Sequence, residues 1–126
     1  TQWRTVAQIM ERQPAVVSPD TPVRDLPPHP PSEVYVIEQN GRVLGLLTAS
    51  EADRAGNPAE AVGSVMQAPK THLHGDHSLE SALERMGRHG VDVLPVMDRA
   101  DVTRLRGIVS LADIMSAYGV ERTPRT

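Results

Sequence analysis

The chain has 126 residues and a formal net charge of −3, and 39% of its residues are hydrophobic, which is enough for one compact domain or two very small ones. Cysteine is absent, which excludes disulfides, thiolate metal sites and cysteine nucleophiles and makes a reducing, cytoplasmic location the expectation. The basic residues form no stripe and no apolar run approaches the roughly 20 residues that cross a bilayer, so we expect neither nucleic-acid binding nor membrane insertion by this chain.

The sequence repeats itself once. TVAQIM at 5–10 resembles AVGSVM at 61–66, an offset of 56, and GLLTASE at 45–51 resembles GIVSLAD at 107–113, an offset of 62. The first copy is therefore shorter in its middle by 62 minus 56, or 6, residues. We predict one repeat at 1–57, a second at 58–120 and a polar tail at 121–126.

In the first copy, a short helix ends at Met10 and a strand is predicted at 15–17. Thr21 and Pro22 then suit a helix start, with a capping hydroxyl followed by proline at the first helical position. LPPHPP at 26–31 cannot continue that helix, because each proline lacks a backbone N–H and clashes with the preceding turn. We expect one helical turn and then an extended segment. A hairpin with its turn at Asn40-Gly41 and a closing helix complete the copy, at 33–38, 42–48 and 49–55.

The second copy has the same order with a complete first helix. A short helix ends at Met66, and a strand is predicted at 71–73. Apolar residues from Leu79 to Met86 recur with the spacing of an amphipathic helix, which ends near Gly90. A hairpin and a closing helix follow at 91–97, 104–110 and 111–118. The two copies predict an α/β (α+β) fold of two tandem β-α-β-β-α repeats.

HLHGDH at 72–77 fits H-x-H-x-D-H, the metal-binding signature of metallo-β-lactamase-type hydrolases. The aligned stretch of the first copy has Val, Ser and Thr in place of the three histidines, so the fold does not require them. His72 and His74 would share one face of a strand, which leaves room for a weak two-ligand site, whereas a catalytic zinc needs about three protein ligands. We favour surface or cleft histidines that can meet an anion, and predict no metal site; a metal-binding hydrolase is the less favoured alternative.

GLLTASE and GIVSLAD each place a hydroxyl residue after a buried strand and an acid three positions later. The simplest interpretation of Thr48 with Glu51, and of Ser110 with Asp113, is a capping box, in which the acid reaches back to the backbone N–H of the capping residue. Matched copies in a tandem repeat favour a shared functional role as well.

With this arrangement the chain resembles tandem cystathionine-β-synthase-type (CBS) domains, the pair called a Bateman module, over about residues 5–118. The second copy carries the resemblance best, through VMQAPKTHLHGDHSLESALERMGRHGVDVLPVMD and LRGIVSLADIM, and the first keeps IMERQPAVVSPDTPV and NGRVLGLLTASEAD. The resemblance implies two repeats packed about a pseudo-twofold axis, the first with a truncated helix. It also implies two clefts between the repeats, which in such modules often bind AMP, ADP, ATP or S-adenosylmethionine.

The resemblance further implies roles for individual residues. Asp113 would accept hydrogen bonds from ribose hydroxyls, and Ser110 would face a phosphate. Thr71, Leu73, Val93 and Pro95 would frame the base, and the first-copy equivalents are Thr48, Glu51, Val17 and Val36. Candidates for phosphate contacts are Lys70, His72, His74, Arg104 and Arg106. Because Ala112 and Ser50 stand where many members carry Lys or Arg, a nucleoside or monophosphate is expected in preference to ATP.

We predict a regulatory module and not an enzyme, because no nucleophile–base pair or carboxylate dyad is apparent. The resemblance implies no required cofactor, a homodimer, and control of an attached or partner protein by ligand-dependent packing of the repeats. A truncated first repeat beside a complete one is similar to the cytoplasmic tails of ClC-type chloride channels and transporters; a standalone CBS pair is a comparable alternative. A ligand-free dimerisation module is the alternative function.

Overall fold

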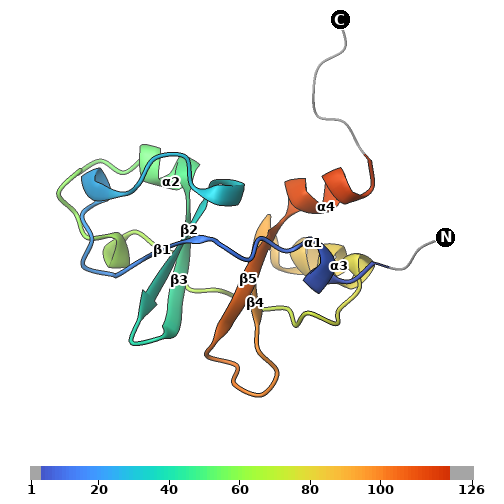
Figure 1. Ribbon diagram of the computed structural model, residues 1–126. Helices are drawn as coiled ribbons and strands as arrows, with labels where there is room; N and C mark the ends of the chain where they lie inside the picture. Colours follow the sequence, from blue (N-terminus) through green and yellow to red (C-terminus); the bar gives the residue numbers. More distant parts are fainter. Residues whose placement is uncertain (1–3, 120–126) are drawn as a thin grey trace, which may run out of the picture.

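The computed structural model describes residues 4–119, in which two small sheets lie side by side with short helices around them (Figure 1). The first sheet has the order β1-β2-β3, from Ala15–Val17, Val34–Gln39 and Arg42–Thr48. The second sheet is the hairpin of β4 (Val93–Met97) and β5 (Leu105–Ser110). Each sheet is built from one repeat, which confirms the predicted α/β class and tandem order. The predicted tail at 121–126 lies outside the described residues.

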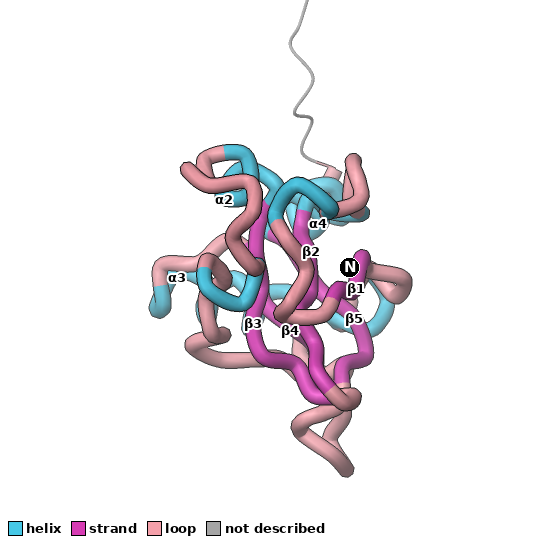
Figure 2. The backbone as a smooth tube through the Cα atoms, turned by 90° about the vertical axis from the view of Figure 1, so that its left-hand side faces the viewer, coloured by secondary structure: helices cyan, strands magenta, loops and turns pink. Residues whose placement is uncertain are grey.

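The helices also follow the predicted order. Each repeat begins with one helical turn, α1 (Val6–Ile9) or the 3-10 turn η3 (Val62–Ser64), and closes with α2 (Ala49–Asp53) or α4 (Leu111–Ala117). Figure 2 shows α2 and α4 at the same end of the molecule. The second repeat adds α3 (Leu79–His89), whose place in the first repeat is taken by two 3-10 turns, η1 (Val23–Asp25) and η2 (Pro31–Glu33).

Local chemistry fixes the turns and helix ends that the sequence predicts. Asn40 and Gly41 join β2 to β3 with φ of 53° and 78°, the pair of left-handed residues that a tight hairpin turn requires. Ser78 caps α3 by accepting a hydrogen bond from the Ser81 N–H at 3.0 Å, and Gly90 ends the helix with φ 64°.

The predicted cap at Thr21 is wrong. The η1 turn begins after Pro22, and the Thr21 hydroxyl lies 3.2 Å from that of Ser18 instead. The reason is the start of the second repeat at 58–60, whose carbonyls accept hydrogen bonds from the first two N–H groups of the turn. Val23 donates to Glu60 and Arg24 to Pro58, both at 2.9 Å, so no side-chain cap is needed.

The predicted strand at 71–73 is also wrong, because the pairing is reduced to a single parallel bridge between Leu73 and Val96. The Leu73 N–H donates to the Pro95 carbonyl at 2.9 Å, and the Met97 N–H donates to the Leu73 carbonyl at 2.8 Å. The next bond of a parallel ladder would require an N–H at residue 95, which proline lacks. Pro95 therefore prevents Thr71 from joining the pairing.

The first segment of each repeat crosses to the sheet of the other. Glu11 exchanges two backbone hydrogen bonds with Ile108 of β5, at 2.8 and 3.0 Å, and Gln67 exchanges two with Leu46 of β3, at 2.9 and 3.0 Å. Glu11 and Gln67 are 56 positions apart, and Leu46 and Ile108 are 62 positions apart, which are the offsets that relate the two copies in the sequence. The two crossings are therefore equivalent, as the predicted pseudo-twofold relation requires. Figure 1 shows the result, with α1 beside α3 and α4 of the second repeat.

A glycine in each repeat makes room for the crossing segment. A Cβ at Gly107 would lie 2.6 Å from the Glu11 carbonyl oxygen, and a Cβ at Gly45 would lie 2.9 Å from that of Gln67. Both distances are shorter than a van der Waals contact. The glycine that opens GLLTASE and GIVSLAD is therefore explained by close packing of another backbone.

Three apolar clusters follow from the exchange. One lies between the sheets and contains Val34, Val36, Leu46 and Ile108. The others lie under the helices: Val62 of η3 completes the first-repeat cluster with Tyr35, Ile37 and Leu47, and Val6 and Met10 complete the second-repeat cluster with Leu73, Leu79, Ala82, Met86, Leu94, Val96, Val109 and Ile114. The core of each repeat is thus completed by residues from the first segment of the other repeat.

Candidate functional site

Both predicted capping boxes are present. Thr48 Oγ1 accepts from the Glu51 N–H at 3.0 Å, and the Thr48 N–H donates to Glu51 Oε1 at 2.9 Å. In the second repeat, Ser110 Oγ accepts from the Asp113 N–H at 3.0 Å, and the Ser110 N–H donates to Asp113 Oδ2 at 3.3 Å. The acids are therefore held rigidly at the starts of α2 and α4, each with one carboxylate oxygen committed to the backbone.

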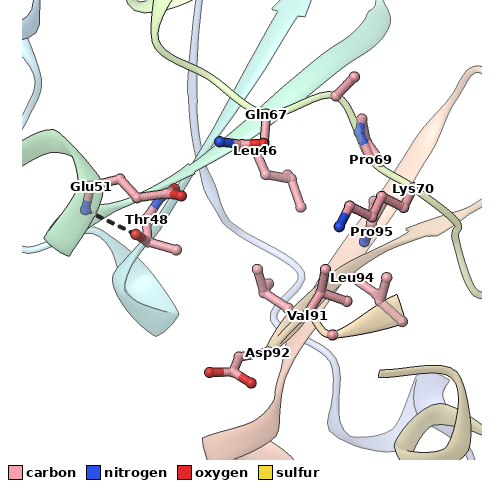
Figure 3. A pocket seen from close by; sticks show the side chains of 13 residues that line it. Leu46, Thr48, Glu51, Gln67, Pro69, Lys70, Val91, Asp92, Leu94 and Pro95 are labelled. Carbon is pink, nitrogen blue, oxygen red and sulfur yellow. Dashed lines mark hydrogen bonds between the residues drawn. The ribbon is translucent and has the colours of Figure 1, made fainter. Parts of the chain in front are cut away.

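A cavity of about 330 Å³ lies between the repeats at the first of these boxes; we call it the inter-repeat cavity. Thr48 and Glu51 line one side, and residues 67–70 and 90–95 line the other (Figure 3). Its lining residues are Leu46, Thr48, Glu51, Gln67, Ala68, Pro69, Lys70, Gly90, Val91, Asp92, Val93, Leu94 and Pro95. The crossing segment at Gln67 brings these two sides together.

The inter-repeat cavity combines apolar walls with a few polar groups. Pro69, Val91 and Pro95 present apolar surface toward the side that carries Glu51 (Figure 3). Among the described residues, Glu51 Oε2 has no hydrogen-bond partner, so it is available to an incoming donor. Lys70 is the only basic residue that lines the cavity, and its amine lies 3.5 Å from the His89 carbonyl, a weak contact that a bound anion can replace.

A second cavity, of about 340 Å³, lies where the starts of α2 and α4 approach each other. Its polar lining consists of the hydroxyls of Ser32, Thr48, Ser50 and Ser110 and the carboxylates of Glu33 and Asp92, and Val34, Val93, Leu111, Ala112 and Met115 supply the apolar part. With two acids and no basic side chain in its lining, this cavity is poorly suited to a phosphate.

The proline-rich segment of the first repeat reaches the second capping box. Ser32 Oγ donates to Asp113 Oδ2 at 3.0 Å. Ser32 has φ 56°, a left-handed conformation that is uncommon outside glycine. The segment is held by buried Pro30 and by the Tyr35 hydroxyl, which donates to the Pro27 carbonyl at 2.5 Å. The chain itself thus supplies a hydroxyl to the acid for which the sequence predicts a ribose partner.

The structure groups the predicted site residues differently from the sequence analysis. Pro95 and Lys70 of the second repeat line the inter-repeat cavity with Thr48 and Glu51 of the first. Val93 lines this cavity and also the second one, where Ser110 lies. Leu73 and Val36 are fully buried in apolar clusters, and Val17 packs against the first-repeat core. Thr71 and His72 line an adjoining cavity of about 220 Å³, which shares Pro69, Lys70 and Pro95 with the inter-repeat cavity.

The predicted phosphate contacts are spread over the molecule. Arg104 is exposed, and Arg106 forms an ion pair with Asp98 at 3.1 Å, so neither lines the inter-repeat cavity. His74 contacts His72 and the Met97 carbonyl. Sequence reasoning missed Gln67, Pro69 and Asp92, because the exchange of first segments that places them at the cavity has no local signal.

Residues 4–119 contain no group of three or more His, Asp or Glu side chains placed to hold a metal ion. Their helices are also all too short or too polar to cross a membrane.

Comparison with known proteins gives a consistent picture of the fold. Residues 62–120 match the CBS domain family model. An inosine-5′-monophosphate dehydrogenase from Helicobacter pylori (strain ATCC 700392 / 26695) is 31% identical over 84 residues, which are 66% of this chain and 17% of the dehydrogenase. The present chain therefore spans a small part of that enzyme's length.

Similar solved structures cover nearly the whole chain. A CBS domain pair in complex with 5′-methylthioadenosine and S-adenosyl-L-methionine superposes with a TM-score of 0.77 at 18% identity, covering 94% of this chain and 98% of that one. A protein with CBS domains from Burkholderia ambifaria MC40-6 has a TM-score of 0.74 at 19% identity, with coverage of 96% and 98%. The cytosolic domain of the Mg²⁺ channel MgtE, in complex with ATP, has a TM-score of 0.68 at 21% identity, with coverage of 86% and 46%.

Proposed function

We propose that this chain, whose residues 62–120 match the CBS domain family model and whose fold is that of a CBS domain pair, is a regulatory module that binds an adenosine-type ligand in the inter-repeat cavity. Binding of a small molecule between the repeats would favour one packing of the two sheets over another. An attached or partner protein would respond to that change. The size of the response is limited by the difference in the ligand's affinity for the two packings.

The observation that carries this proposal is the combination of apolar walls and one free carboxylate oxygen. A flat purine ring can lie against Pro69, Val93 and Pro95. Glu51, fixed by its capping box, keeps Oε2 free to accept hydrogen bonds from a vicinal diol such as that of ribose. Hydrogen bonds to a charged acceptor contribute about 1.5–3 kcal/mol each, which is enough to select ribose over an apolar group.

Charge narrows the ligand class. Lys70 faces the two acids Glu51 and Asp92 in the lining, so the cavity has a net charge of −1. A triphosphate would bring several negative charges to this site, a monophosphate would bring at most about two, and a nucleoside or a sulfonium nucleoside would bring no net negative charge. We therefore expect adenosine, AMP, 5′-methylthioadenosine and S-adenosylmethionine to bind more tightly than ATP.

The ligands of the similar structures support the adenosine class. One CBS pair was solved with 5′-methylthioadenosine and S-adenosyl-L-methionine, and the MgtE cytosolic domain with ATP. These proteins are only 18% and 21% identical to this chain. The residues proposed to contact the ligand are therefore those that line the cavity of this chain.

The cavity at Glu51 is a better candidate than the cleft at Asp113. Ser32 already donates a hydrogen bond to the Asp113 carboxylate, and a ribose hydroxyl would have to displace it. We retain Asp113 with Ser110 as a second candidate site, of lower affinity, because its carboxylate is held in the same way.

The test is calorimetric titration of the chain with adenosine, AMP, 5′-methylthioadenosine, S-adenosylmethionine and ATP. The decisive variant is Glu51→Gln, which keeps the capping box but removes the charge, since glutamine also suits this position. We expect this variant to lower the affinity for the tightest-binding ligand more than about tenfold, which is equivalent to about 1.4 kcal/mol. Asp113→Asn is the matched variant in the second repeat and should leave that affinity within about twofold.

Each outcome assigns the site. If Asp113→Asn abolishes binding and Glu51→Gln does not, the cleft favoured by the sequence is the functional one. If no adenosine compound binds or raises the melting temperature, the alternative of a ligand-free packing and dimerisation module is correct. The expected homodimer can be measured in the same samples by sedimentation.

The parent protein belongs to the proposal as well. The comparisons include part of an inosine-5′-monophosphate dehydrogenase and the cytosolic domain of a Mg²⁺ channel, so enzymes and transporters both carry similar modules. We propose a cytosolic position, next to either kind of protein. A chloride channel or transporter of the ClC type stays a prediction, which co-purification of this chain with its native partner would test.

A further inference from the structure

The histidines of HLHGDH surround one turn beside β4. Leu73 turns into the second-repeat core, and the flanking rings of His72 and His74 meet on the other side, with Nε2 atoms 3.2 Å apart. The rings stand almost perpendicular, at 84°, with centroids 4.8 Å apart. Both residues are partly buried, so the contact is built into the fold.

His74 is oriented by its backbone surroundings. Its Nδ1 lies 2.9 Å from the Met97 carbonyl oxygen, which can only accept, so Nδ1 carries the hydrogen. In the neutral ring this leaves the lone pair on Nε2, the atom that points at His72. A histidine that donates its far N–H to a carbonyl is the usual arrangement of a metal ligand, since the hydrogen bond fixes the tautomer and the ring plane.

His77 has a different role in the same turn. Its ring Nδ1 accepts a hydrogen bond from the backbone N–H of His74 at 2.8 Å, and the backbone N–H of His77 donates to the His74 carbonyl at 3.1 Å. His77 therefore holds the turn that positions His74.

His72 supplies the second imidazole of the pair. Its ring also lines the cavity of about 220 Å³ beside the pair, which leaves room for water. Two imidazole rings thus share one small space.

We propose that His72 and His74 form a two-imidazole site for a borderline divalent metal ion, with Zn²⁺ as the principal candidate and water in the remaining positions. Two Zn–N bonds of about 2.0–2.1 Å at a tetrahedral angle place the nitrogens about 3.3 Å apart, and the structure holds the Nε2 atoms at 3.2 Å. For both Nε2 lone pairs to face the metal, the hydrogen between the two rings has to move from Nε2 to Nδ1 of His72, which is a change of tautomer.

The surroundings define the kind of site. Two protein ligands and the nearby positive charge of Arg85, which donates to the His72 carbonyl at 2.7 Å, make binding weaker than in four-ligand structural zinc sites. Imidazole ligands exclude Mg²⁺ and Ca²⁺, which prefer oxygen. The site is exchangeable, and it is separate from Glu51 and the adenosine-type ligand.

The test titrates the 126-residue chain with Zn²⁺ alone, with Mg²⁺ as a negative control. We expect one Zn²⁺ per chain, and nitrogen chemical shifts that change in the rings of His72 and His74 but not in the exposed ring of His29. Variants His72→Val and His74→Ser introduce the residues that the first repeat carries at 16 and 18, so the turn is compatible with them. Each should weaken Zn²⁺ binding more than about tenfold, since even a lost outer-shell contact costs that much.

His29→Gln is the matched control and should bind Zn²⁺ like the parent chain. The proposal is overturned if the parent chain binds no Zn²⁺, if the His72→Val and His74→Ser double variant binds it equally well, or if the ring shifts appear elsewhere. The ring shifts are measured on the unaltered chain, so they decide the question even if a variant fails to fold.

Discussion

Replacing Gly107 by alanine would test the exchange of first segments directly. The new Cβ would lie 2.6 Å from the Glu11 carbonyl oxygen and 3.0 Å from the sulfur of Met10. The nearer contact is to backbone, so the crossing segment has to move away from β5 by several tenths of an ångström. That shift disturbs both hydrogen bonds between Glu11 and Ile108.

The magnitude follows from these two effects. Overpacking of a well-packed interior costs about 1–3 kcal/mol, and each weakened hydrogen bond adds up to about 1 kcal/mol. We expect Gly107→Ala to reduce the free energy of unfolding by about 2–4 kcal/mol, out of a total of about 5–15 kcal/mol for a typical domain. For a chain of this length the melting temperature should fall by about 8–15 °C.

The assay is urea and thermal unfolding followed by circular dichroism, with Gly87→Ala as the control. Gly87 lies in α3 with no atom within 4 Å of an added Cβ, so alanine there should stabilise the helix by about 0.5–1 kcal/mol. The two substitutions are chemically identical and should change stability in opposite directions. A Gly107→Ala chain that melts at or above the parent temperature would refute the close crossing of Glu11 over β5.

Other predictions concern the cavity and the proline-rich segment. Lys70→Gln should weaken the binding of AMP several-fold and leave the affinity for adenosine unchanged in calorimetric titrations, because only AMP has a phosphate to pair with the ammonium. An equal loss of affinity for both ligands would exclude a contact between Lys70 and the phosphate. Gly45→Ala should lower both stability and ligand affinity, since Gln67 lines the inter-repeat cavity; unchanged affinity in the folded variant would show that Gln67 does not shape the site. Burial and the charge of Asp53 raise the pKa of Tyr35 above 10.0, so stability should fall as pH rises beyond that value, and Tyr35→Phe should abolish this part of the pH dependence in melting experiments. A parent chain with constant stability in this range would contradict that environment for the phenol.

The sequence predicts elements whose signal is local. The hairpin at Asn40-Gly41, the amphipathic α3 and both capping boxes depend on residues within a few positions of each other, and all are present. The strand at 71–73 fails for a reason that is also local but was overlooked, since Pro95 has no N–H for the ladder.

The site was less predictable, because its partners are far apart in the chain. The capping acids were identified, but the sequence could not show that Glu51 faces Pro95 and Lys70. Likewise, Leu73 lies between half-buried neighbours and Val36 lies in a run of buried residues, and only the packed structure shows which apolar cluster contains each of them.

The crossing segments also bear on how such a chain could arise. The core of the first repeat takes Val62 from the start of the second, and the second takes Val6 and Met10 from the start of the first. One repeat by itself would lack an apolar segment in its core and could obtain it only from another copy, as in a domain-swapped dimer. Joining two copies in one gene turns that exchange between chains into an internal contact. The two halves can then differ, one with 3-10 turns in place of the long helix and the other with the histidines, while each keeps its partner.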